Sequence, residues 1–210
     1  MATKRYDAIL DAALKAFSDN GFEGTGLREI ARIAQVAQPT INYHFKSKDK
    51  LFEAIVERGA SRSTRLRIER LDTLLEKPGS VQLEDIVRVL FEIYNMPPEE
   101  ISQEEQDFNK FIAKFGYGDS DYTRKIVLAA FDDLADNFIA AIEKTDEGFD
   151  RASATWAYLN ALPTGIYAID HVRRFPGLAG VSADDPRCDF SFDALIKFVC
   201  AGMRSLTKLS

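Results

Sequence analysis

The chain has 210 residues, of which 46% are hydrophobic and 29% are charged, and its net charge is −6. This composition is that of a globular protein with a sizeable core, and the net acidity argues against a protein that coats nucleic acid through bulk positive charge. No apolar run reaches the roughly 18–20 residues of a membrane span, and the N-terminus lacks the apolar segment of a secretory signal peptide, so we expect a cytoplasmic protein without membrane contact.

Charge is unevenly distributed along the chain. Residues 1–70 contain 13 Lys and Arg against 9 Asp and Glu, a net of +4, whereas the remaining 140 residues carry a net of −10. This asymmetry indicates a basic module that faces nucleic acid, attached to an acidic body. The two cysteines, Cys188 and Cys200, lack the spacing of a metal or redox motif, so we interpret them as reduced thiols.

The first 50 residues predict three helices and the beginning of a fourth. Apolar residues recur at helical spacing from Tyr6 to Phe17, and Asn20-Gly21 supplies a stop. A short second helix over residues 27–34 and a third over 38–45 follow, separated by a tight break. Ser47 can cap the fourth helix.

The rest of the chain also predicts helices, at about residues 82–95, 102–115, 120–144, 150–174 and 190–207. Pro163 should kink the helix over 150–174. Because no segment alternates with a period of two, the predicted fold is all-α. We place the functional boundary at residue 50, between domains 1–50 and 51–210.

The most informative stretch is residues 25–46, two short helices joined by a turn. Apolar residues such as Ile30, Ile41 and Phe45 should pack on the first helix, which leaves polar side chains of the third helix facing outward. The outward residues are Gln38, Thr40, Tyr43 and His44, with Arg28, Lys46, Lys48 and Lys50 on either side. Such a face suits a helix that enters the DNA major groove while flanking cations and backbone N–H groups hold phosphates.

These residues carry a family resemblance. The run Ile9-Leu10-Asp11-Ala12-Ala13, Phe17, Asn20-Gly21-Phe22, Thr25, Ile30-Ala31, Ala34, Val36, Phe45-Lys46-Ser47-Lys48 and Leu51 resembles the N-terminal signature of the TetR family over about 50 residues. The resemblance implies a three-helix DNA-binding domain fused to a larger helical ligand-binding and dimerisation domain. It also implies a ligand-responsive regulator, a repressor, that binds a palindromic operator in double-stranded DNA as a homodimer. The DNA-contact candidates are Arg28, Gln38, Pro39, Thr40, Asn42, Tyr43, His44 and Lys48, the last on a phosphate.

The sequence departs from the family pattern at three positions. Gln35 stands where a turn glycine is usual, and a positive φ there would cost about 1 kcal/mol. Ala37 removes a helix cap worth about 1 kcal/mol. Asn42 replaces a common tyrosine but could still meet a phosphate or an adenine edge. These departures affect which bases the third helix would contact, but they leave the prediction of a helix-turn-helix motif unchanged.

Two other functional classes compete with a ligand-responsive repressor. Catalysis is disfavoured because the only histidines are His44 and His171, and no nucleophile elbow, phosphate loop or metal-spaced cluster is present. We therefore expect no catalytic residue, no metal and no cofactor. A chromosome-organisation or cell-division factor with a similar DNA-binding fold, but without a small-molecule effector, stays open as the alternative.

The acidic body contains most of the aromatic residues, 17 of 23 lying after residue 70. Some could line a pocket for a small apolar or aromatic effector, since ligand sites are mostly apolar with a few polar anchors. The candidates are Phe91, Tyr94, Asn95, Phe108, Phe111, Phe115, Phe131, Phe138, Trp156, Tyr158 and Asn160. The apolar content of the last two long helices, 150–174 and 190–207, exceeds what a monomer core needs and predicts a dimer interface. The residues expected in it are Trp156, Leu159, Ile166, Tyr167, Ile169 and Val172 of the first helix and Leu195, Ile196, Val199 and Met203 of the second.

Overall fold

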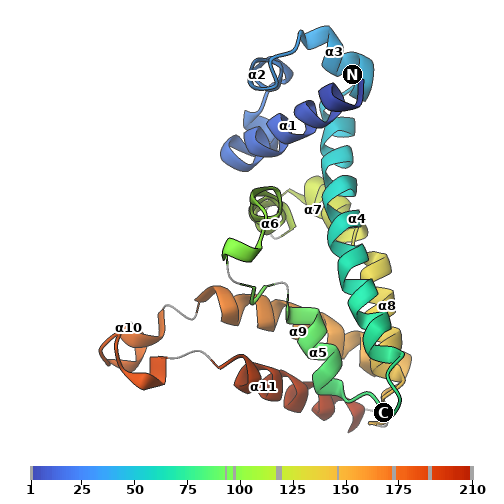
Figure 1. The fold of residues 1–210 in the computed structure, drawn as a ribbon, viewed down its shortest axis with the longest axis vertical. Coiled ribbons are helices and arrows are strands. Elements are labelled where there is room, and N and C mark those ends of the chain that lie inside the picture. The colour runs from blue at the N-terminus through green and yellow to red at the C-terminus, as the bar shows by residue number, and fades with distance from the viewer. Residues whose placement is uncertain are drawn as a thin grey trace. The chain divides into compact units, whose positions relative to one another are not determined.

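The computed structural model describes residues 2–92, 94–96, 98–116, 120–145, 147–171, 174–188 and 191–208. Every regular element within these ranges is helical, which confirms the predicted all-α class (Figure 1). None of the described helices is both long enough and apolar enough to cross a membrane.

The described chain forms a series of α-helices with short 3₁₀ turns. The α-helices are α1 (Ala2–Gly24), α2 (Leu27–Ile33), α3 (Gln38–Phe45), α4 (Lys48–Leu75), α5 (Leu83–Glu92), α6 (Gln103–Gly116), α7 (Asp121–Ala129), α8 (Asp132–Glu143), α9 (Arg151–His171), α10 (Phe175–Ala179) and α11 (Phe192–Arg204). The 3₁₀ turns are η1 (Pro98–Glu100), η3 (Pro186–Cys188) and η4 (Ser205–Lys208).

Most predicted helix ends agree with the structure. The third helix spans the predicted residues, Gln38–Phe45, and the Ser47 hydroxyl caps α4 by accepting the Lys50 N–H at 3.2 Å. Gly21 interrupts α1 with a φ of 77°, as the Asn20-Gly21 pair indicated.

The single helix predicted over 120–144 is wrong. The chain forms α7 and α8, separated by a turn at Ala130 and Phe131, where the Phe131 N–H bonds to the Leu128 carbonyl at 3.0 Å. The physical reason is tertiary. Helix α7 packs on α6, whereas α8 belongs to a different compact unit, and the turn lets each helix pack in its own unit.

The helices form two compact units, one of Met1–Arg65 with Pro97–Asp132 and one of Leu66–Met96 with Asp133–Ser210. Helix α4 contributes residues to both units. The functional boundary at residue 50 stays a prediction. Residues 51–65, α6 and α7 share a hydrophobic core with the first three helices.

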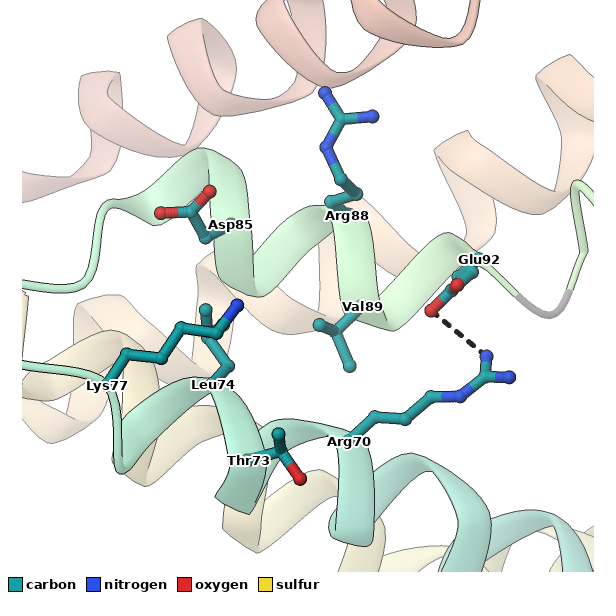
Figure 2. A pocket seen from close by; sticks show the side chains of 8 residues that line it. All are labelled: Arg70, Thr73, Leu74, Lys77, Asp85, Arg88, Val89 and Glu92. Carbon is teal, nitrogen blue, oxygen red and sulfur yellow. Dashed lines mark ion pairs between the residues drawn. The ribbon is translucent and has the colours of Figure 1, made fainter.

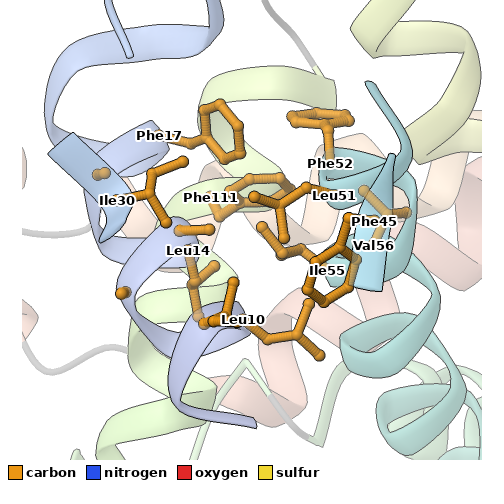
Figure 3. Close-up of a cluster of buried hydrophobic side chains, with 14 of the residues drawn as sticks. Leu10, Leu14, Phe17, Ile30, Phe45, Leu51, Phe52, Ile55, Val56 and Phe111 are labelled. Carbon is orange, nitrogen blue, oxygen red and sulfur yellow. The ribbon is translucent and has the colours of Figure 1, made fainter. Parts of the chain in front are cut away.

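The core of the first unit is built around phenylalanine rings. Phe111 of α6 lies in the middle of side chains from α1 to α4, and Phe52 contacts both Phe111 and Phe115, each at a centroid distance of 5.1 Å (Figure 3). Helix α6 approaches α4 closely, because a Cβ added at Gly59 would lie 2.2 Å from the Phe108 ring. Helix α6 therefore packs on both α4 and α1, and α1 in turn packs on α2.

The second unit is held by α5, α9 and α11, which pack pairwise on one another. Phe91 of α5 is fully buried, and a Cβ added at Gly165 would lie 2.3 Å from its ring. Helix α9 continues through Pro163 as one assigned helix. Arg204 at the end of α11 forms paired bonds to Glu84 at 2.8 Å and also binds Glu147, which ties three segments of this unit together.

Candidate nucleic-acid interface

The turn between α2 and α3 is short, and its first residues are hydrogen-bonded to α2. The Gln35 N–H bonds to the Arg32 carbonyl at 3.3 Å and the Val36 N–H to the Ala31 carbonyl at 3.0 Å. Gln35 has a φ of 54°, so the conformation for which glycine is usual does occur here. The expected cost of about 1 kcal/mol therefore applies to this position.

Helix α3 is anchored by its apolar side. Ile41 and Phe45 are buried, and the Phe45 ring stacks on Tyr6 of α1 at 4.8 Å. Its first residue follows Ala37, which makes no side-chain cap, and Pro39 lies in its first turn. The N-terminal end of α3 is thus free of a competing cap.

The opposite side of α3 is presented to solvent. Tyr43 is 83% exposed, and Pro39 and Asn42 are also exposed. Gln38, Thr40 and His44 are half-buried, and the His44 ring meets Tyr6 edge-on at 5.8 Å. Structure and sequence agree that these side chains lie on one short helix whose apolar residues face inward.

Two of the predicted contact residues lie outside α3. Arg28 is exposed on α2. The Lys48 ammonium donates to the Phe22 carbonyl at 2.9 Å and lies 4.4 Å from the centre of the Phe22 ring. Lys48 therefore holds the end of α1 against α4, and its phosphate contact stays a prediction.

Sequence reasoning did not single out Lys4 and Arg5 as members of this surface. Both are exposed in the first turns of α1, next to Tyr6, whose ring packs on His44 and Phe45 of α3. The available signal was the position of two cations directly before an aromatic residue on the inward face of the first helix.

The residues predicted to line one effector pocket are divided between the two units. Phe108, Phe111, Phe115 and Phe131 belong to the first unit, where Phe111 and Phe115 pack against Phe52. The others belong to the second unit. Phe91, Phe138 and Tyr158 are buried there, Tyr94 is half-buried, and Asn95, Trp156 and Asn160 are exposed.

A groove of about 280 Å³ lies between α4 and α5 in the second unit (Figure 2). Arg70, Thr73, Leu74 and Lys77 line it from α4 and the turn after it, and Asp85, Arg88, Val89 and Glu92 line it from α5. None of these residues was among the predicted ligand contacts, because charged residues on exposed helix faces are usually solvated.

Two short helices joined by a tight turn, the second with a buried apolar side and an exposed polar side, define a helix-turn-helix DNA-binding module. Residues 9–55 match the sequence profile described as bacterial regulatory proteins, tetR family. The N-terminal part of the chain is therefore similar to the DNA-binding domain of the TetR family, and the fold is an N-terminal helix-turn-helix domain followed by a larger helical domain.

Similar proteins are found both among characterised regulators and among solved structures. The chain is 40% identical over 82 residues to the HTH-type transcriptional regulator AcrR of Shigella flexneri, a match that covers 39% of this chain and 38% of that regulator's length. Among solved structures, Salmonella enterica GusR matches with a TM-score of 0.63 at 16% identity, covering 97% of this chain and 95% of that one. Bacillus subtilis FadR in complex with stearoyl-CoA matches with a TM-score of 0.60 at 16% identity, covering 97% and 98%. These structures share the fold along the whole chain.

Proposed function

We propose that this protein is a transcriptional repressor that binds a palindromic operator through α3 as a homodimer, acts in the cytoplasm and responds to a small effector. The observation that carries the DNA-binding part is the exposure of α3. An aromatic side chain that is 83% exposed, Tyr43, stands on a helix whose other aromatic residue, Phe45, is buried. Exposed aromatic and hydrogen-bonding groups on one short helix are suited to contacts with base edges.

The homodimer is supported by large exposed apolar residues on two adjacent helices of the second unit. Trp156, Leu159 and Tyr167 on α9 are 62%, 53% and 58% exposed, and Phe198 on the adjacent α11 is 71% exposed. The three residues of α9 follow one another at spacings of three and eight, which places them on one side of the helix. Large exposed apolar residues gathered on adjacent helices mark an interaction surface. Val172, also expected in this interface, lies outside the described residues.

A two-fold dimer fits the proposed operator. In an interface of this kind the same patch of each copy contacts the other, and the two recognition helices then read identical half-sites. The half-sites would be about 34–36 Å apart, or a multiple of that distance.

Operator binding is tested by selecting duplexes from a random pool with the full-length protein and then measuring affinities by fluorescence anisotropy. Thr40→Ala and Arg28→Ala should each cost about 1–3 kcal/mol on the selected operator and relax base discrimination, if they read base edges. Lys197→Ala, which removes an exposed cation from α11, is the matched control and should bind as wild type. Wild-type affinity in both α3 and α2 variants would exclude the proposed docking.

The dimer is tested by sedimentation velocity. Phe198→Glu should yield monomers, because it places a charge in the proposed interface. Leu178→Glu is the control, since Leu178 is 76% exposed on α10, away from α9 and α11. A wild-type monomer at micromolar concentration that retains full operator affinity would contradict the homodimer.

The effector is proposed to be small, with an apolar or aromatic body, and to weaken operator binding. Linkage requires that operator weaken effector binding by the same factor, and a coupling of about 1–3 kcal/mol is enough for a switch. Ligands that stabilise the protein yet leave operator affinity unchanged would favour an architectural DNA-binding protein without an effector.

A further inference from the structure

The groove between α4 and α5 has an apolar floor. Leu74 of α4 and Val89 of α5 are half-buried, and each side chain points toward the opposite helix (Figure 2). Apolar surface that stays in contact with water at the bottom of a concave site is favourably covered by an apolar ligand. The groove therefore suits a ligand whose body is hydrocarbon.

The charged head groups around the floor do not all face the groove. The Arg88 guanidinium points away from α4 (Figure 2), where it lies 2.5 Å from Asp193 and 5.7 Å from the centre of the Phe192 ring. Arg88 thus lends the groove only its aliphatic stem. Arg70 and Lys77 stand at the two ends of the floor on the α4 side (Figure 2).

The carboxylates of the groove already have partners. Glu92 lies 3.0 Å from Arg70, and Asp85 accepts the Gln82 N–H at 3.4 Å at the start of α5. Within the described part of the chain, Lys77 forms no salt bridge. The ammonium of Lys77 is therefore the charge in this groove that an anionic ligand can neutralise without displacing a carboxylate.

We propose that this groove binds a small carboxylic acid with an unbranched apolar body, and that this acid is the effector. The carboxylate binds Lys77, and the hydrocarbon chain covers Leu74 and Val89 toward the stem of Arg70. The volume of about 280 Å³ lies at the lower end of ligand sites, which are roughly 300–1,000 Å³, so the acid is a small one. The effector role rests on the proposed function, whereas the binding site does not.

The probe is octanoate, with octanamide as its neutral counterpart of the same shape, and binding to the full-length protein is measured by calorimetry. Octanoate should bind at least about tenfold more tightly than octanamide, because a hydrogen bond to a charged group is stronger than a neutral one. Lys77→Gln should remove that preference, and Val89→Phe should block both probes by filling the floor. Arg88→Gln is the matched control, because it removes a lining cation whose head group points elsewhere, and it should bind octanoate as wild type.

Either of two results would show that this groove does not bind the acid. Absence of octanoate binding, or equal binding by wild type, Lys77→Gln and Val89→Phe, overturns the proposal.

Operator affinity, measured for the same proteins, separates this inference from the proposed function. Without octanoate, wild type, Lys77→Gln and Val89→Phe should bind the selected operator equally, and octanoate should weaken binding by wild type alone. Loss of operator binding in wild type itself would defeat the proposed function. Operator binding that is intact and insensitive to bound octanoate would defeat the effector role of the groove.

Discussion

Gly59 of α4 is the position where a single methyl group should do most damage to the first unit. A Cβ at this site would lie 2.2 Å from Cε2 of Phe108 and 2.4 Å from both Cδ2 and Cζ, whereas ordinary contact begins at 3.4 Å. The Phe108 ring would have to move away by about the difference between these distances and 3.4 Å. It has little room to move, because Phe108 is only 7% exposed and its neighbour Phe111 is fully buried. Overpacking of this kind costs about 1–3 kcal/mol, and the helix-propensity gain of alanine over glycine returns about 0.8–1 kcal/mol. We therefore expect Gly59→Ala to destabilise the protein by up to about 2 kcal/mol.

The measurement is urea unfolding followed by far-ultraviolet circular dichroism. Gly24→Ala on α1 is the matched control, because its new Cβ would meet only Asn20 Cβ, at 3.6 Å, and its effect should stay within about 0.5 kcal/mol. A second variant, Phe108→Leu, should relieve the clash, so the double variant should be more stable than the sum of the two single changes by at least about 0.5 kcal/mol. A stabilised Gly59→Ala, or strictly additive changes, would refute the close packing of α4 on α6.

Three further predictions concern other contacts. Lys114→Gln should destabilise the first unit by about 0.5–1.5 kcal/mol in the same urea assay, because the Lys114 ammonium donates to the Ser18 carbonyl at 2.8 Å at the end of α1; an unchanged midpoint would contradict this role. Iodoacetamide should label Cys188 before Cys200 in the folded protein, as mass spectrometry of peptides would show, because burial raises the pKa of the Cys200 thiol to about 12. The Arg204 hydrogen bonds hold the pKa of Glu84 below its ordinary value of 4.5, so this carboxylate stabilises the fold above that pH and the contribution is lost as the pH falls through the lowered pKa. Arg204→Met should therefore flatten the acid limb of a stability–pH curve, and an unchanged limb would exclude Glu84 as its source.

The helix-turn-helix module could be predicted from sequence because its determinants are local. Helical periodicity, the Asn20-Gly21 stop and the Ser47 cap act within a few residues of one another, so the bounds of α3 and the break in α1 agree with the structure. The positive φ of Gln35 occurs at the position where the family resemblance indicated a turn glycine.

The division of the chain into two cores could not be predicted in this way. Periodicity shows that Phe111 and Phe115 face inward, but it does not show toward which core, and only tertiary packing places them beside Phe52. The break between α7 and α8 has the same origin. Its residues, Ala130 and Phe131, include no glycine or proline, so no local stop signal marks the break, and α7 and α8 pack in different units.

The candidate sites show the same difference between features set by local sequence and features set by tertiary packing. The sequence by itself determined the buried apolar side of α3, because the position of a side chain around one helix follows from the helical repeat. Only the tertiary structure decided that the Lys48 ammonium binds the Phe22 carbonyl, and that Lys77 and Val89 border one groove. Each of these arrangements joins residues from different helices, and the path of the chain between such helices is fixed by the burial of both cores rather than by any local pattern.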